Sequence, residues 1–344
     1  MKKSVKAILA ILLIVGVIFG GVFLFKKSKE GKNEKKYSVI STSFPGYDFA
    51  KAVAENTDVS VRMLLKPGAE SHTFEPTPQD IMAIKSSNLF LYVGGDSDEW
   101  VKKILNEIDP NKTKVLKLVD LVKTKEEELV EGMEEDHHEE DEDHHDKDHH
   151  DKDHHEHDKK EAKDEKEAEV DEHVWTSLRN AKEITKKISA EIAKIDKDEK
   201  TKFEKNTKVY EEKLDGLDKR FSEMVKKAKR KEVIVGDRFP LRYFVDDYDL
   251  KYYAAFPGCS EQTEANAKTI SFITKKVKED KIPAIFKIEL SKGLIAETIA
   301  KETGAKVYEF HSAHNISERD FEAGVTYADL MERNYSVLEK ALND

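Results

Sequence analysis

Histidine is concentrated in one short stretch of this sequence. Nine of the 13 histidines lie between residues 137 and 157, mostly as adjacent pairs separated by Asp, Glu and Lys. The stretch contains no apolar residue, so it cannot build a core and we expect it to stay solvated and disordered. Imidazole and carboxylate groups are ligands for borderline divalent metals such as Zn²⁺, so the stretch predicts several weak metal sites. A charged linker that only adds solubility is the alternative. The nine residues are His137, His138, His144, His145, His149, His150, His154, His155 and His157.

The other four histidines are scattered, each in a loop or at the end of a predicted segment. His72 lies in a loop that two prolines and a capped helix restrain, and His173 opens the sequence HVWTS where the acidic stretch ends. His311 ends a predicted strand, and His314 follows three residues later. A structural role for each histidine alone is the alternative to a metal-binding role.

A carboxylate completes a plausible ligand set. Asp237 follows the predicted strand 233–235, and its alternative roles are an ion pair with Arg238 or a helix cap. Zinc in proteins takes about four N, O or S ligands in a tetrahedral arrangement. We therefore predict one assembled zinc site, in which His314 is the alternative to His311. The predicted ligands are His72, His173, His311 and Asp237.

Catalysis is not expected at such a site. No pair of histidines has the H-E-x-x-H spacing of zinc hydrolases, and no general base accompanies the candidate ligands. A zinc hydrolase is kept as an alternative that turnover of ester or peptide substrates would support. The single cysteine, Cys259, excludes an intrachain disulfide and a cysteine-based zinc site. The formal net charge is −11 and no basic face with interleaved aromatic residues is evident, so nucleic acid is not an expected partner.

The first 36 residues have the pattern of a membrane-directed segment. Three lysines precede 19 uncharged residues, 7–25, and three more follow. This pattern is typical of a signal peptide or an uncleaved anchor helix. We expect an anchor, because no small-residue cleavage site stands out, with secretion after cleavage as the alternative. The lysines after the run argue against export under the positive-inside rule, so the expected extracytoplasmic location is inferred from the metal-gathering stretch.

From residue 37 onward, short apolar runs alternate with helical patterns. This order predicts parallel sheets with helices on both faces, and ligands then bind beyond the carboxyl ends of the strands. Strands are predicted at 38–42, 59–65, 89–93, 114–118, 233–235, 252–256, 284–288 and 306–310. Shorter helices are predicted at 79–85, 100–108, 241–246, 264–278, 292–303 and 325–342.

Two long helices lie between the two groups of strands. Apolar residues recur every three or four positions over 181–195 and again over 203–228. A helix of about 28 residues spans about 40 Å at 1.5 Å per residue, which suits a strut between two lobes. We predict an α/β protein of two lobes, each a mostly parallel sheet flanked by helices, joined by this one long rigid helix. The predicted parts are the N-terminal segment 1–36, an N-terminal lobe 37–200 with the insertion 123–172, the long helix 201–230 and a C-terminal lobe 231–344.

Motifs over about residues 37–342 resemble one family of proteins. The sequence GAESHTFEPTPQD at 68–80, the HVW at 173–175 after a His/Asp/Glu-rich insertion, and the long central helix are similar to the zinc-binding lipoproteins of ABC-type metal importers. The resemblance implies a receptor that captures Zn²⁺ outside the cytoplasm and delivers it to a membrane permease. It also implies that zinc is cargo, that no bond is made or broken, and that the ectodomain is a monomer.

The resemblance assigns ligands with two departures. The family takes one histidine from each of the first two motifs, which match His72 and His173. It takes a third from a segment that opens the second lobe, where this sequence reads GDRFP and offers Asp237 instead. It takes a carboxylate after the last strand, where His311 falls here. We infer an exchange of imidazole and carboxylate, and Glu289 is the next oxygen ligand to consider if neither histidine after that strand binds.

Two other functions within reach of this pattern stay open. A manganese or iron receptor of the same family is one, although those harder ions prefer more carboxylate than the predicted site offers. A metal-dependent adhesion or interaction protein is the other, since related receptors have been credited with adhesion.

Overall fold

The computed structural model describes residues 35–71, 73–133, 170–258 and 267–344. The chain divides into two compact units, Met1–Lys36 and Tyr37–Asp344, and the second holds all the elements below. Three predictions fall outside the described residues: the N-terminal apolar run, His72 and the nine clustered histidines. Among the described helices, none is both long enough and apolar enough to cross a membrane.

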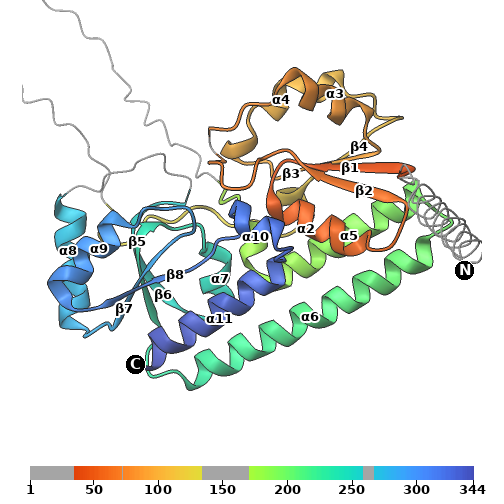
Figure 1. Cartoon of the computed structure of the whole chain (residues 1–344). Coiled ribbons are helices and arrows are strands. Elements are labelled where there is room, and N and C mark those ends of the chain that lie inside the picture. The colour runs from red at the N-terminus through yellow and green to blue at the C-terminus, as the bar shows by residue number, and fades with distance from the viewer. Residues whose placement is uncertain (1–34, 72, 134–169, 259–266) are drawn as a thin grey trace, which may run out of the picture. The chain divides into compact units, whose positions relative to one another are not determined.

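The first sheet has four parallel strands in the order β2-β1-β3-β4. Side chains alternate between its two faces, so Val39 and Leu91 join one core cluster and Ile40 and Phe90 join another. Helices α2 and α5 cover the first face, and α3 and α4 cover the second (Figure 1). The strands are β1 (Tyr37–Ser41), β2 (Val59–Met63), β3 (Leu89–Tyr92) and β4 (Lys114–Lys117). The helices are α2 (Phe44–Val53), α3 (Pro78–Ser86), α4 (Val101–Ile104) and α5 (Leu178–Ile195).

The predicted cap of helix α3 is confirmed. The Thr77 side chain accepts a hydrogen bond from the backbone N–H of Asp80, and the Asp80 carboxylate accepts one from the backbone N–H of Thr77. The helix predicted over 100–108 is instead divided into α4 and a 3₁₀ turn, Leu105–Glu107. Tightening of a last helical turn is common, and here it precedes Asp109-Pro110.

The second sheet repeats the arrangement in the order β6-β5-β7-β8, again with all strands parallel. Helices α8 and α9 pack on one face around Ile234 and Ile285, and the other face joins the large core that includes residues of α6, α7 and α11. The strands are β5 (Glu232–Arg238), β6 (Lys251–Phe256), β7 (Ala284–Lys287) and β8 (Lys306–Glu309). The helices are α7 (Arg242–Asp247), α8 (Ala267–Glu279), α9 (Leu294–Thr303), α10 (Glu318–Glu322) and α11 (Tyr327–Asn343).

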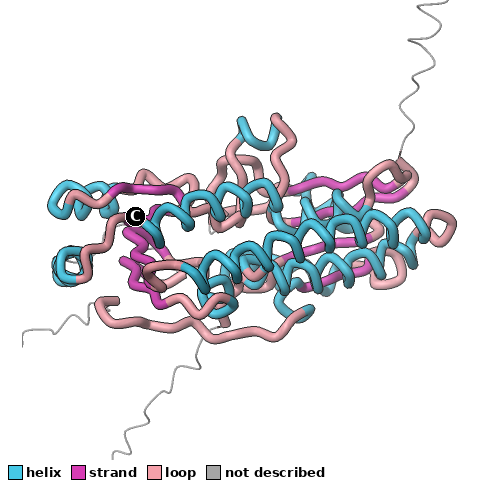
Figure 2. Tube along the Cα trace, turned by 90° about the horizontal axis from the view of Figure 1, so that it is seen from below, coloured by secondary structure: helices cyan, strands magenta, loops and turns pink. Residues whose placement is uncertain are grey.

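Helix α6 (Lys200–Lys227) is the long helix that the sequence predicted. It packs against α2 and α5 below the first sheet and against α11 below the second (Figure 1). The view from below in Figure 2 shows these helices lying across the space between the two sets of strands. The predicted α/β fold, with two parallel sheets flanked by helices and one long joining helix, is therefore confirmed.

Candidate metal centre

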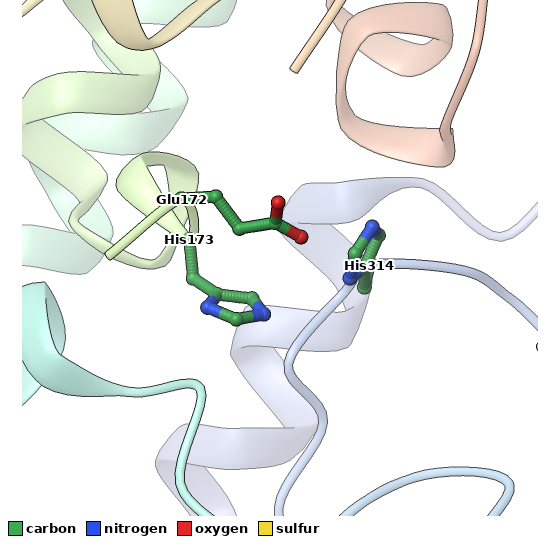
Figure 3. Close-up of side chains that lie close together, drawn as sticks. All are labelled: Glu172, His173 and His314. Carbon is green, nitrogen blue, oxygen red and sulfur yellow. The ribbon is translucent and has the colours of Figure 1, made fainter. Parts of the chain in front are cut away.

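Three buried residues bring possible metal ligands together between the two sheets. One ligand atom from each of Glu172, His173 and His314 lies within 4.8 Å of the others, and all three side chains are buried (Figure 3). Glu172 and His173 precede the 3₁₀ turn Val174–Thr176 that leads into α5, whereas His314 lies in the loop after β8. The site therefore joins segments about 140 residues apart, beyond the carboxyl end of a parallel strand.

Asp171 orients the imidazole of His173. Its Oδ1 lies 3.0 Å from His173 Nδ1 and also accepts the backbone N–H of His173 at 2.8 Å. Because Nδ1 donates to this carboxylate, Nε2 is the nitrogen left to bind a metal. Burial alone would lower the pKa of His173, but the charge of Asp171 and the hydrogen bond to it outweigh burial and raise that pKa above 6.5. A carboxylate behind a ligating histidine is a common arrangement at zinc sites.

We expect Asp171→Ala to weaken zinc binding by about 10- to 100-fold, the usual cost of losing a group that orients a metal ligand. The imidazole loses its fixed tautomer and part of its basicity, while the ligand atoms themselves remain. Chelator competition at pH 7.5 would measure the change. Asp120→Ala is the matched control, because the ion pair that this exposed aspartate forms in the described part of the chain is with Lys117, at 3.6 Å. Equal affinities for Asp171→Ala and the unmodified chain would contradict the orienting role.

Glu172 is completely buried, and one of its two carboxylate oxygens has a partner. Oε2 accepts the backbone N–H of Ser97 at 3.2 Å, whereas Oε1 has no hydrogen-bond partner in the described part of the chain. Gly95 packs directly against this side chain, since a Cβ at that position would lie 1.9 Å from Oε2. The carboxylate is thus held in place with one oxygen directed away from its anchoring N–H.

A second buried carboxyl group lies behind Glu172. Asp98 accepts hydrogen bonds from Val93 N–H at 2.5 Å and from the Thr42 hydroxyl at 3.1 Å. Burial raises the pKa of Asp98 to about 7, and the nearby charge of Glu172 adds to the increase. At neutral pH this group is therefore partly protonated, which reduces the repulsion between the two carboxyl groups.

The metal-free protein should lose stability as the pH rises from about 4 to about 7, partly through Asp98. A carboxyl whose pKa is raised on folding binds its proton more tightly in the folded state, so its contribution is complete below 3.8 and is lost as the pH passes about 7. Asp98→Asn should flatten this part of the profile, measured by urea unfolding with a chelator present. Asp320→Asn is a control of opposite sign. The Arg333 guanidinium lowers the pKa of Asp320, so this carboxyl stabilises the folded protein more as the pH rises. An unchanged slope in Asp98→Asn would contradict the assignment.

The molecule has two halves, the first holding strands β1–β4 and the second holding strands β5–β8. The loop that carries His314, after β8, is hydrogen-bonded to the first half. Asn315 Nδ2 donates to the carbonyls of Lys66 at 2.9 Å and Ala69 at 2.7 Å, in the loop just before residue 72. The indole N–H of Trp175 donates to the carbonyl of Ser312 at 2.8 Å, and the Trp175 and His314 rings lie 4.9 Å apart between centroids. The two halves therefore hold His314 in position before a metal binds.

His311 takes another place. Its Nδ1 accepts the backbone N–H of Ala313 at 2.9 Å and lies 3.6 Å from a carboxylate oxygen of Glu289. The Glu289 carboxylate in turn accepts the backbone N–H and the hydroxyl of Ser312, at 2.7 and 2.5 Å. Both side chains shape the loop that presents His314, and His311 does not join the group formed with His173.

Asp237 also lies outside that group. Its Oδ1 accepts the backbone N–H of Arg238 at 2.9 Å, and its buried Oδ2 has no hydrogen-bond partner among the described residues. Burial raises the pKa of Asp237, although hydrogen bonding and the charge of Arg238 act to lower it. A histidine could not stand at the preceding position, because a Cβ on Gly236 would lie 2.7 Å from backbone atoms of Ala296.

A cavity of about 40 Å³ adjoins the two histidines, and it is large enough for a few water molecules. Its lining includes Glu70 from the first half and Arg238 from the second, which form an ion pair at 3.1 Å.

Comparisons with known proteins identify the family of this chain. Residues 39–341 match the family model described as zinc-uptake complex component A, periplasmic. The chain belongs to this zinc-uptake family. It is 31% identical to the zinc-binding lipoprotein AdcA of Streptococcus pneumoniae over 93% of its own length, and it spans 58% of that relative. It is 31% identical to the high-affinity zinc uptake system protein ZnuA of Bacillus subtilis, covering 92% of this chain and 91% of the relative.

Two solved structures of metal-binding proteins share the fold. The Zn(II)-bound ZnuA-like domain of Streptococcus pneumoniae AdcA is 27% identical with a TM-score of 0.68, over 90% of this chain and all of that one. The metal-dependent lipoprotein YcdH of Bacillus subtilis gives the same identity and TM-score over 89% of this chain and all of its own. The resemblance inferred from the motifs at 68–80 and 173–175 is thereby confirmed.

Proposed function

We propose that this chain captures Zn²⁺ outside the cytoplasm and delivers it to the permease of an ABC importer. Membership of the zinc-uptake family supports the transport role. The observation that carries zinc itself is the buried group of two imidazoles and one carboxylate within 4.8 Å. Such nitrogen and oxygen ligands suit Zn²⁺ better than the harder ions Mn²⁺ or Mg²⁺.

The proposed imidazole ligands are His173, His314 and His72. His314 replaces His311 in this set because it shares the buried group with His173. His72 enters from the sequence motif alone, although the preceding loop, Lys66 to Ala69, is hydrogen-bonded to Asn315 next to His314. Zinc is cargo here, so the protein needs no general base and catalyses no reaction.

Its location and partners follow from the same role. Relatives named lipoproteins support an extracytoplasmic, membrane-anchored receptor, and we propose that residues 1–36 provide the anchor. Residues 37–200, which hold the first sheet, and residues 231–344, which hold the second, would act as lobes on either side of the site. The long helix 201–230 would join them. The remaining partners are the metal ion and the permease; we propose a monomeric ectodomain that does not bind nucleic acid.

Metal analysis of purified residues 37–344 would test this function. We expect one zinc ion per chain to survive dialysis against a weak chelator in a variant lacking residues 134–169, with additional weaker sites in the chain that keeps them. Mn²⁺ should not displace the tightly held zinc. Failure of both proteins to retain zinc, or hydrolysis of ester or peptide substrates by the zinc-loaded protein, would overturn the proposal.

A further inference from the structure

We infer that Glu172 is the anionic ligand of the metal site, in the role that the sequence pattern gives to Asp237. This inference rests on the proposed zinc-binding function and concerns which carboxylate serves it. Glu172 contributes an oxygen to the 4.8 Å group with His173 and His314, whereas Asp237 is absent from that group among the described residues.

Burial without a full set of partners is the first observation. Glu172 has no exposed surface, and its Oε1 has no hydrogen-bond partner among the described residues. No lysine or arginine in the described part of the chain forms an ion pair with it at 4.0 Å or less. A buried carboxylate in this condition is costly unless a cation compensates it. A divalent metal held by the two neighbouring imidazoles would provide that compensation.

Orientation is the second observation. The backbone N–H of Ser97 binds Oε2 at 3.2 Å, which fixes the carboxylate and leaves Oε1 for the metal. The absence of a side chain at Gly95 permits this position, since a Cβ there would lie 2.4 Å from the Cβ of Glu172 as well as 1.9 Å from Oε2. Gly95 has no positive φ, so the contact with Glu172 is what favours glycine there.

The neighbouring carboxyl groups have other partners. Asp171 is occupied by the Nδ1 and backbone N–H groups of His173, and Asp98 by Thr42 and Val93. The Glu289 carboxylate accepts both donors of Ser312. Among these carboxylates, Glu172 is the one that lies in the 4.8 Å group with both imidazoles. Asp237 also has a buried oxygen, Oδ2, without a hydrogen-bond partner among the described residues, but it lies outside that group. Two imidazoles and one carboxylate are nitrogen and oxygen ligands that zinc takes in proteins.

The decisive experiment compares Glu172→Gln with Asp237→Asn, two changes that remove a charge and preserve shape. We expect Glu172→Gln to weaken zinc binding by roughly 100-fold, because the amide that replaces the carboxylate is a neutral and weaker ligand for the cation. Asp237→Asn should change the affinity by less than about threefold, a difference within 0.7 kcal/mol. The spectrum of the Co²⁺-loaded protein should change its band positions in Glu172→Gln and not in Asp237→Asn.

Gly95→Ala provides a test that keeps the charge. The added methyl group should displace Glu172 and lower the affinity for zinc, while Gly216→Ala, at a helical position with no atom within 4 Å of the new Cβ, should have no effect. Removal of an uncompensated buried charge should leave the metal-free Glu172→Gln protein at least as stable as the parent chain. Loss of stability in that variant would point to a structural role for the carboxylate instead.

The outcomes separate this inference from the proposed function. Zinc binding in the parent chain with unchanged affinity in Glu172→Gln would overturn the inference and leave the function standing. A large loss in Asp237→Asn would return the role to that aspartate. Absence of tight zinc binding in the parent chain would reject the proposed function itself.

Discussion

Replacing His314 with alanine should lower the affinity for zinc by about 100-fold, assuming that one ligand carries about a quarter of a binding free energy near 12 kcal/mol. The imidazole is buried with His173 and Glu172, and its loop is already hydrogen-bonded to the opposite half of the molecule. Water could fill the vacated position only as a weaker neutral ligand. Chelator competition followed by calorimetry would measure the loss.

His311→Ala is the matched control for this prediction, since it removes the same side chain three residues away. It should cost much less affinity, because His311 contacts Ala313 and Glu289 and lies outside the group of proposed ligands. Its main effect should be to make the loop after β8 less ordered. A greater loss of zinc binding in His311→Ala than in His314→Ala would show that His311 is the ligand after all.

Trp175→Ala should reduce the free energy of unfolding by about 3–5 kcal/mol, the usual cost of truncating a buried aromatic side chain. Trp175 is fully buried, and its indole N–H is bonded to Ser312 across the junction between the two halves. Zinc affinity should fall as well, because the ring supports both His173 and His314 at centroid distances of 5.4 and 4.9 Å. Urea unfolding of the metal-free protein would measure the stability.

Trp175→Phe provides the graded comparison. It keeps most of the apolar contact but loses the hydrogen bond, so we expect a smaller loss of stability than in Trp175→Ala. If Trp175→Ala lowered the free energy of unfolding by less than about 1 kcal/mol, its effect would be close to that of an ordinary surface substitution. That result would contradict the role of Trp175 at the junction.

The general plan of the protein could be predicted from the sequence because its signals are local. Strand and helix patterns, the Thr77 cap and the long apolar repeat of α6 each depend on residues close together in the chain. The buried position of His173 was also predictable, since it stands beside a tryptophan at the point where an acidic stretch gives way to apolar sequence.

The burial of Glu172 and Asp171 could not be predicted in the same way. They end a long run of acidic residues, and composition does not show which carboxylates turn inward. Their burial depends on partners far away, such as Ser97 for Glu172 and Tyr243, whose hydroxyl donates to the Asp171 carbonyl. Such contacts between distant segments are not encoded in any short window.

The choice between His311 and His314 depended on the path of a loop. Proximity to the end of the strand favoured His311, but Ala313 adopts a left-handed conformation with a φ of 60°. Residues other than glycine rarely adopt this conformation, so the turn at an alanine could not be predicted from the residue types. The turn, together with the hydrogen bond from Ala313 to His311, brings His314 to the group that contains His173.

The position of Trp175 beside the two histidines should make zinc binding detectable by tryptophan fluorescence. Its ring lies 5.4 Å from that of His173, whose pKa the charge of Asp171 and the hydrogen bond to it raise in spite of burial, and a protonated imidazole at such range quenches indole emission by accepting an excited electron. Coordination keeps the imidazole neutral, so zinc capture near pH 6 should brighten the protein's ultraviolet fluorescence. The chain has two tryptophans, and Trp100→Phe would leave Trp175 as the single emitter. Capture and release could then be followed in real time without a dye attached to the protein.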